Sequence, residues 1–325
     1  MPTLPRPHGG TLIDRTAAPL EAAALTARAP GLPSLSLEPD QLDELELLAT
    51  GGASPLRGFL GREDHRSVLS RWRLASGLLW PWPLTLPVAA ERLGRFPPGT
   101  EVALRDRAGR LRAVLTVSDA FVRNPQEEAL ALFDTTNPAH PGVARLLSRP
   151  SGALGGEVVA LPFPADRPLA ERRLSPRELR RLLSARGVSR AAALHPRGAP
   201  TRVQAYLARL ALGLAEVLVI HPPASAGEAA VAAWDEVAAS LPEGRGIVAA
   251  LPAPDRYGSG REVLLEALVR RNYGLSQLFV VRPGDQLRPT DGLPPDIDAS
   301  EVGVSILPFA AELSLPGGEG LAAAG

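Results

Sequence analysis

The stretch from Arg190 to Pro222 alternates short apolar runs with turn residues and one helical repeat. Ala191–Leu194 and Glu216–Ile220 are apolar runs of strand length, and His195–Pro200 carries two prolines and a glycine, which is typical of a loop. From Thr201 onwards apolar residues recur three and four positions apart, which indicates an amphipathic helix. This order predicts one strand–helix–strand unit of a parallel sheet. In such sheets ligands bind where the carboxyl ends of strands meet helix N-termini.

The C-terminal half continues this alternation of helices and strands. It is preceded by a helix that begins at Ser175-Pro176, with Glu178 three positions after the serine, a pattern that predicts a capping box. The further elements expected are helices at Gly227–Ala239 and Arg261–Arg271 and strands at Gly246–Leu251 and Leu278–Val281.

The N-terminal half is rich in short alternating runs and turn residues, which predicts a mostly β domain with peripheral helices. We expect three domain-level units, namely residues 1–168, residues 169–312 and a flexible tail at 313–325. The expected strands are Thr11–Ile13, Leu84–Val88, Glu101–Leu104, Leu111–Val117 and Val158–Leu161, and the expected helices are Pro39–Ala49, Arg62–Arg71 and Gln126–Phe133.

Composition excludes several classes of function. The 325 residues carry 35 basic and 35 acidic side chains, so no net charge draws the chain to nucleic acid or to an anionic membrane. There is no lysine, which excludes a P-loop kinase, and no cysteine, which excludes disulfides and cysteine-ligated zinc. We expect no metal site, no signal peptide and no membrane span, and hence a cytoplasmic protein.

Several ordered motifs resemble the ATP sulfurylase (sulfate adenylyltransferase) family. In the N-terminal half they are Pro7–Leu12, Glu44–Leu60, Trp80–Pro83 and Thr135–Val143. In the C-terminal half the segment from Ala250 to Gly274 continues the similarity. The resemblance implies a PUA-like β-barrel domain followed by a Rossmann-like α/β nucleotidyltransferase-type domain with a parallel sheet.

The loop after the first strand of the α/β domain departs from the family pattern. The family writes it as Q-x-R-N-P-x-H-R-A-H-E, and only Arg197 and Arg202 match. His195 stands at the glutamine position, whereas Thr201 and Gln204 replace the two histidines that hold the nucleotide's phosphates in the family. Thr-x-x-Gln at a helix start is also a capping box, and that interpretation competes with phosphate binding.

The two later loops of the family's site are eroded as well. His221-Pro222 is present after the next strand, followed by no charged residue as far as Gly227. In the loop that the family writes G-R-D-H-A-G, Arg282 matches, the aspartate–histidine pair is missing, and Asp285 lies two positions further along.

The resemblance implies a reaction in which a sulfate oxygen attacks the α-phosphorus of ATP and pyrophosphate leaves. Loss of one preorganised donor typically costs about 10²–10³ in rate, so we expect a weakly active or inactive homologue. Such a protein would keep an anion or nucleotide cleft, or act as a partner subunit in sulfur metabolism. One alternative is an active enzyme with rearranged donors, and another is RNA binding through the PUA-like domain. If the protein is active, the catalytic residues are Arg197, Arg202 and Arg282, and His195, Thr201, Gln204 and His221 join them in binding substrate.

The expected ligands follow from the same resemblance. They are sulfate or another oxyanion and Mg-ATP, with no covalently bound cofactor, no nucleic acid and no membrane. A homo-oligomer, or a complex with an intact ATP sulfurylase, is expected. We expect the three arginines to form an open anion-accepting cleft without carboxylates nearby. In the alternative, the arginines pair with local acids, for example Glu216, Glu228 or Asp285.

Overall fold

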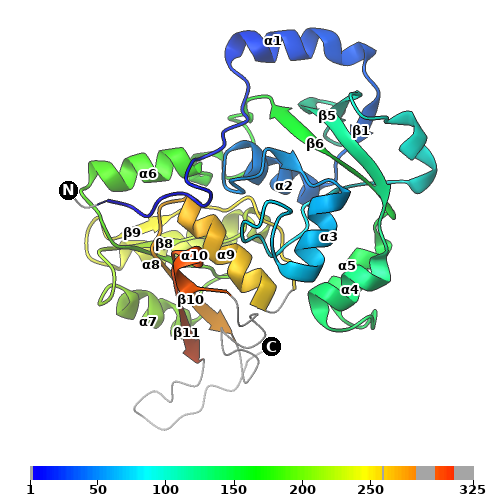
Figure 1. The fold of residues 1–325 in the computed structure, drawn as a ribbon. Helices are drawn as coiled ribbons and strands as arrows, with labels where there is room; N and C mark the ends of the chain where they lie inside the picture. Colours follow the sequence, from blue (N-terminus) through cyan, green and yellow to red (C-terminus); the bar gives the residue numbers. More distant parts are fainter. Residues whose placement is uncertain (1–2, 258–259, 283–296, 311–325) are drawn as a thin grey trace.

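The computed structural model describes residues 3–257, 260–282 and 297–310. Two domains follow one another along the chain, a mixed β-sheet domain with peripheral helices and an α/β domain (Figure 1). The tail expected at 313–325 lies outside the described residues.

The N-terminal domain is built on a six-stranded sheet. The strand order is β1-β4-β5-β6-β2, with β3 pairing with β6 away from this path. Its longest strands pair antiparallel, with register shifts within β5, while β1 pairs parallel with β4. The strands are β1 (Ser34–Ser36), β2 (Gly58–Phe59), β3 (Leu86–Val88), β4 (Glu101–Arg105), β5 (Leu111–Val122) and β6 (Gly152–Ala160), and the helices are α1 (Pro19–Arg28), α2 (Pro39–Ala49), α3 (Arg62–Arg71), α4 (Pro125–Phe133) and α5 (Pro141–Ser148).

The α/β domain has a five-stranded sheet in which every pair is parallel, as the sequence predicted. The strand order is β11-β10-β7-β8-β9. The strands are β7 (Ala191–Leu194), β8 (Val217–Ile220), β9 (Gly246–Val248), β10 (Gln277–Arg282) and β11 (Ser305–Ala310), and the helices are α6 (Pro176–Ala185), α7 (Arg202–Ala211), α8 (Glu228–Ala239), α9 (Gly260–Asn272) and α10 (Ala299–Val302).

Most sequence-based boundaries agree with the structure, and one predicted strand is wrong. Residues 11–13 form no strand; the Ile13 N–H instead donates to the Ser54 hydroxyl at 2.8 Å. The helix α1 was not predicted, because its N-cap is Ala18, which offers no side-chain acceptor. The helix α5 was missed because its first turn contains Pro141 and Gly142, which are typical of loops.

The two faces of the parallel sheet belong to different hydrophobic cores. Ala192 and Leu194 of β7 pack with α7 and α8, whereas Ala191 and Ala193 face a larger core that also contains α9 and the N-terminal domain. The helix α9 lies between the sheet and the N-terminal domain (Figure 1). Eleven of its thirteen residues are buried. The two domains therefore share one continuous core.

Buried polar residues of the α9 segment fix how the domains meet. The Arg261 guanidinium donates to the carbonyls of Val68, Leu69 and Pro81 and lies 4.2 Å from the Trp72 ring centroid. Burial lowers the pKa of Arg261 to about 10, so the side chain remains charged at neutral pH.

The end of α9 also holds the chain's N-terminal segment. The Asn272 side chain accepts from the His8 backbone N–H at 2.8 Å and donates to the carbonyls of Gly52 and Ser54. The His8 ring in turn donates through Nε2 to the Leu79 carbonyl at 2.6 Å. Three distant segments of the chain are thereby joined around one buried amide.

His8 should make the protein sensitive to acid. Burial lowers the pKa of His8 from 6.5 to about 4, so between these values the unfolded chain binds a proton that the folded chain does not. The contribution of the neutral His8 to the free energy of unfolding is therefore fully present above pH 6.5. As the pH falls towards 4, this free energy decreases by about 1.4 kcal/mol per pH unit. Chemical denaturation of wild type and His8→Gln between pH 7 and 4.5 measures it. The variant should be less stable at pH 7 but lose less stability on acidification; equal slopes would contradict the assignment.

Candidate functional site

One face of α9 carries the charged side chains that meet the loops after β7 and β8. Glu262, Glu266 and Arg270 are spaced four residues apart and so lie on the same side of the helix, and Tyr273 follows directly after the last residue of α9. Glu262 contacts Arg197, Glu266 contacts His195, and Tyr273 contacts His221. These residues, together with Asp255 beside Arg197, form what we call the donor cluster: His195, Arg197, His221, Asp255, Glu262, Glu266, Arg270 and Tyr273.

Arg197 is bound by carboxylates. Its Nη2 lies 2.9 Å from Glu262 Oε2, and its Nε lies 3.9 Å from Asp255 Oδ1. Desolvation is the largest effect on the Arg197 pKa and acts downwards, yet the neighbouring acids hold that pKa above its ordinary value. The expectation that Arg197 would lie without a carboxylate nearby is wrong. Its partners are also not those suggested by the sequence, since Glu216 bonds Ser189 instead.

Glu262 connects two loops at once. While Oε2 accepts from Arg197, Oε1 accepts from the backbone N–H of Arg256 at 3.1 Å. Glu262 is buried, whereas the Arg197 side chain is 40% exposed. A ligand from solvent can therefore reach the guanidinium, but it would compete with a carboxylate already in place.

His195 points inward from the end of β7. Its Nδ1 donates to the His221 carbonyl at 2.7 Å, and its Nε2 lies 3.3 Å from Glu266 Oε1. Burial, followed by the charge of Arg270, lowers the pKa of His195 to about 3. With Nδ1 protonated and the ring neutral, Nε2 presents a lone pair to Glu266.

His221 is fully buried and packs edge-on against Tyr273, with ring centroids 5.0 Å apart. Burial, followed by the charge of Arg270, lowers the pKa of His221 well below its ordinary value. Neither ring nitrogen has a hydrogen-bond partner among the described residues. Contact between this ring and a ligand would require the packing against Tyr273 to open.

The start of α7 is satisfied by its own side chains. The Thr201 hydroxyl accepts from the Gln204 N–H at 3.2 Å, and the Gln204 amide oxygen accepts from the Thr201 N–H at 3.1 Å. The capping-box interpretation is therefore confirmed. Trp234 of α8 fixes the same loop by donating from Nε1 to the Gly198 carbonyl at 2.7 Å.

The two remaining arginines are placed differently. Arg202 is exposed at the first residue of α7, and no ion pair to it occurs within the described part of the chain. Arg282 is the last residue of β10, on the side of the sheet where the carboxyl ends of the parallel strands β7 and β8 also lie. Asp285 and the rest of that loop lie outside the described residues. The ligand-binding roles of all seven residues stay predictions.

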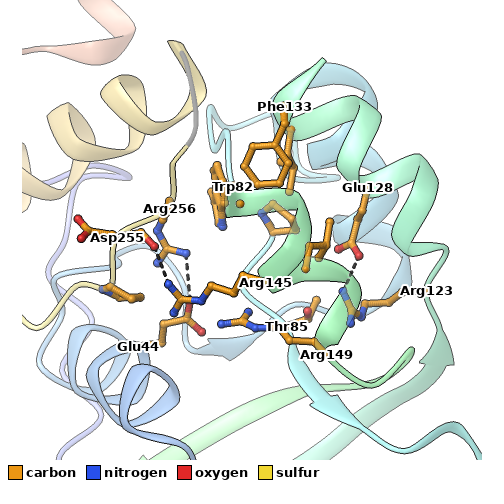
Figure 2. A pocket seen from close by; sticks show the side chains of 15 residues that line it. Glu44, Trp82, Thr85, Arg123, Glu128, Phe133, Arg145, Arg149, Asp255 and Arg256 are labelled. Carbon is orange, nitrogen blue, oxygen red and sulfur yellow. Dashed lines mark hydrogen bonds and ion pairs between the residues drawn. The ribbon is translucent and has the colours of Figure 1, made fainter. Parts of the chain in front are cut away.

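A small cavity lies between the N-terminal domain and residues 254–256 (Figure 2). Its volume is about 50 Å³, which suits a few water molecules but not a nucleotide. Arg256 donates to Glu44 at 3.0 Å, Arg145 donates to the Asp255 carbonyl at 2.8 Å, and Arg123 is paired with Glu128. The first two of these contacts join the domains, the third lies within the N-terminal domain, and the cavity adds no open site.

Comparison with known proteins identifies the family. Residues 5–162 match the PUA-like domain model and residues 170–284 match the ATP-sulfurylase model. A sulfate adenylyltransferase of Symbiobacterium thermophilum is 38% identical over 95% of this chain and 82% of its own length. The chain belongs to the ATP sulfurylase family. A sulfate adenylyltransferase of a Synechococcus strain is 35% identical over 85% of this chain and 72% of its own length.

Two longer proteins share this part of the ATP sulfurylase family architecture. A probable bifunctional SAT/APS kinase 2 of Sorangium cellulosum is 35% identical, and the chain covers 49% of it. A solved structure described as a hexameric APS kinase from Thiobacillus denitrificans superposes with a TM-score of 0.74 at 31% identity, covering 94% of this chain and 57% of that one. This chain thus spans about half of each longer protein.

Within the described ranges no cluster of three or more acidic or histidine side chains is arranged to hold a metal ion. Among the helices described, none has both the length and the apolar character needed to cross a bilayer.

Local sequence patterns did not reveal the acidic residues of the donor cluster. Glu262, Glu266 and Asp255 were not singled out, because leucine spacing made the α9 segment look like core packing alone. Two glutamates four residues apart among the apolar residues of this helix were the available signal, since a buried carboxylate needs a cationic partner.

Removing the Thr201 hydroxyl should destabilise the protein without involving any ligand. Thr201→Ala leaves the Gln204 N–H without its acceptor, and loss of such a cap costs about 0.5–2 kcal/mol of unfolding free energy. Equilibrium urea denaturation measures the change. Thr201→Ser, which keeps the hydroxyl, serves as the control and should be near wild type. If both variants are equally stable, the cap contributes nothing.

Neutralising Glu262 should strengthen anion binding at Arg197. Glu262→Gln keeps an acceptor for the Arg256 N–H but removes the charge that competes with a ligand, so sulfate or pyrophosphate should raise the melting temperature more than in wild type. Each variant is compared with its own ligand-free melting temperature, which separates binding from stability. The double variant Glu262→Gln/Arg197→Gln should lose the gain. A ligand-induced shift that does not increase in the single variant would contradict the competition.

Proposed function

We propose that this ATP sulfurylase homologue transfers adenylyl groups to sulfate weakly or not at all. The observation that carries the proposal is that the first loop's donors are engaged within the protein. Thr201 and Gln204 cap their own helix, and the accessible guanidinium of Arg197 is held by Glu262.

Adenylyl transfer to sulfate requires donors that are free to bind the reactants. Sulfate and ATP are both anions, and pyrophosphate leaves with further negative charge, so rate enhancement depends on positioned donors and cations around the phosphates. Two neutral side chains stand where the family places phosphate-binding histidines. At about 10²–10³ per lost donor, the combined loss is roughly 10⁴ or more.

The three arginines of the predicted site favour a role in ligand binding. Arg197 is reachable from solvent, Arg202 is exposed, and Arg282 ends a strand at the same edge of the sheet. We infer that this edge retains affinity for an oxyanion or for Mg-ATP. The chain would act as a homo-oligomer or as the partner of an intact ATP sulfurylase; the hexameric description of the structurally similar protein supports assembly of this kind.

An active sulfate adenylyltransferase is the second candidate. The specific observation in its favour is the identity of 38% over nearly the whole chain with a protein that carries that name. In this version His195, Arg197, Arg202, His221 and Arg282 form a rearranged donor set. It requires His195 and His221 to leave their buried contacts when substrate binds.

Activity is tested by phosphate release from purified protein with Mg-ATP, sulfate and a pyrophosphatase, against the same mixture without sulfate. From a typical turnover of about 10 s⁻¹, a loss of 10⁴ predicts at most about 10⁻³ s⁻¹. A sulfate-dependent rate of about 1 s⁻¹ or more would favour the second candidate instead.

A gain-of-function variant identifies the reason for low activity. Thr201→His/Gln204→His restores the family's two donors and should raise the sulfate-dependent rate at least about tenfold. Thr201→Ser/Gln204→Glu keeps a capping box without cationic donors and is the matched control. If both double variants behave alike, the missing histidines do not limit the reaction.

A further inference from the structure

A larger cavity, of about 570 Å³, lies where the interdomain linker crosses the N-terminal domain. Its walls come from α2, the turn between β4 and β5, the linker between β6 and α6, and the short 3₁₀ helix Ala224–Ala226. The volume falls within the roughly 300–1,000 Å³ of small-molecule sites, which are frequent at domain interfaces. No residue of the donor cluster lines it.

The inner wall is apolar and its charges are already matched. Leu42, Phe163 and three prolines supply flat hydrophobic surface, and the Arg167 guanidinium lies 4.9 Å from the Phe163 ring centroid. Asp43 and Glu46 are bound by Arg173 at 3.1 and 2.7 Å. Because desolvation raises the pKa of both carboxyls, this wall favours a neutral or planar group over an anion.

The rim offers two arginines whose present partners are easily replaced. Arg107 is 67% exposed and pairs with the exposed Glu38, and such surface pairs contribute little to stability. Arg110, 60% exposed, pairs with Asp106. Asp106 also accepts two hydrogen bonds from Arg112 and the backbone N–H groups of Ala108 and Arg110, so it stays satisfied if the Arg110 guanidinium turns away.

We propose that this cavity binds a phosphorylated small molecule with a flat ring, of nucleoside-monophosphate size. The ring would lie against Phe163 and Leu42, where planar surface meets a cation. The phosphate would be held by Arg107 and Arg110 at the rim, where guanidiniums bind it bidentately. The charged lining groups are Arg107, Arg110, Arg112, Arg167 and Arg173 against Asp43, Glu46, Asp106 and Asp166.

The test measures thermal shift and calorimetric titration with AMP, adenosine and inorganic phosphate as probes. AMP should bind, and adenosine or phosphate alone should bind at least about tenfold more weakly, because each lacks half of the recognised groups. Arg107→Gln/Arg110→Gln, two exposed positions where folding is not at risk, should weaken AMP binding at least tenfold. Arg62→Gln/Arg66→Gln on the exposed face of α3 is the charge-matched control and should bind like wild type.

The variant Arg197→Gln separates this cavity from the donor cluster. AMP binding retained in Arg197→Gln and lost in Arg107→Gln/Arg110→Gln supports the proposal. AMP binding lost in Arg197→Gln and retained in Arg107→Gln/Arg110→Gln places the nucleotide at the donor cluster and overturns the proposal. No AMP binding up to about 5 mM also overturns it, and so does phosphate binding as tightly as AMP, which would leave the ring without a role.

Discussion

The burial of α9 on all sides is the constraint on which the rest of the structure depends. A helix between a parallel sheet and a second domain exposes almost none of its surface, so each of its polar side chains must find a partner inside the protein. Arg261 finds backbone carbonyls of the N-terminal domain, Asn272 joins the N-terminal segment to the same domain, and Glu262 finds Arg197. Polar side chains of this one helix therefore hold the two domains together and bind the Arg197 loop.

This constraint gives a physical reason for the state of the donor cluster. In a nucleotidyltransferase-type site, guanidinium and imidazole groups are useful when their donors are held ready for a charge that develops during reaction. Here Arg197 and His195 already contact carboxylates of α9. The first turn of α7 is capped by its own side chains. An incoming anion must therefore compete with hydrogen bonds and ion pairs that these groups already form within the protein.

Local patterns predicted the elements well, and long-range contacts account for what they missed. The bounds of α2 and α3 and the capping boxes at Ser175 and Thr201 follow from neighbouring residues, and the structure has them. The all-parallel sheet follows from the alternation of strands and helices. The pairing of Arg197 with Glu262, 65 residues later, could not be predicted locally, because the glutamate spacing indicates that a cationic partner is needed but not which distant arginine supplies it. The wrong strand at 11–13 has the same cause, since that segment bonds a loop 41 residues away.

The two oxygens of Glu262 have a consequence for communication across the molecule. One oxygen holds Arg197 and the other holds the backbone of Arg256, whose side chain is anchored on Glu44 in the N-terminal domain. If a bound anion draws Arg197 away, the charge on Glu262 is redistributed towards the Arg256 N–H, which strengthens that bond and the attachment of its loop to α2. By thermodynamic reciprocity, whatever loosens Arg256 from Glu44 then changes anion affinity at Arg197 by the same factor. Anion occupancy at Arg197 would then be coupled to the attachment of the Arg256 loop to the N-terminal domain.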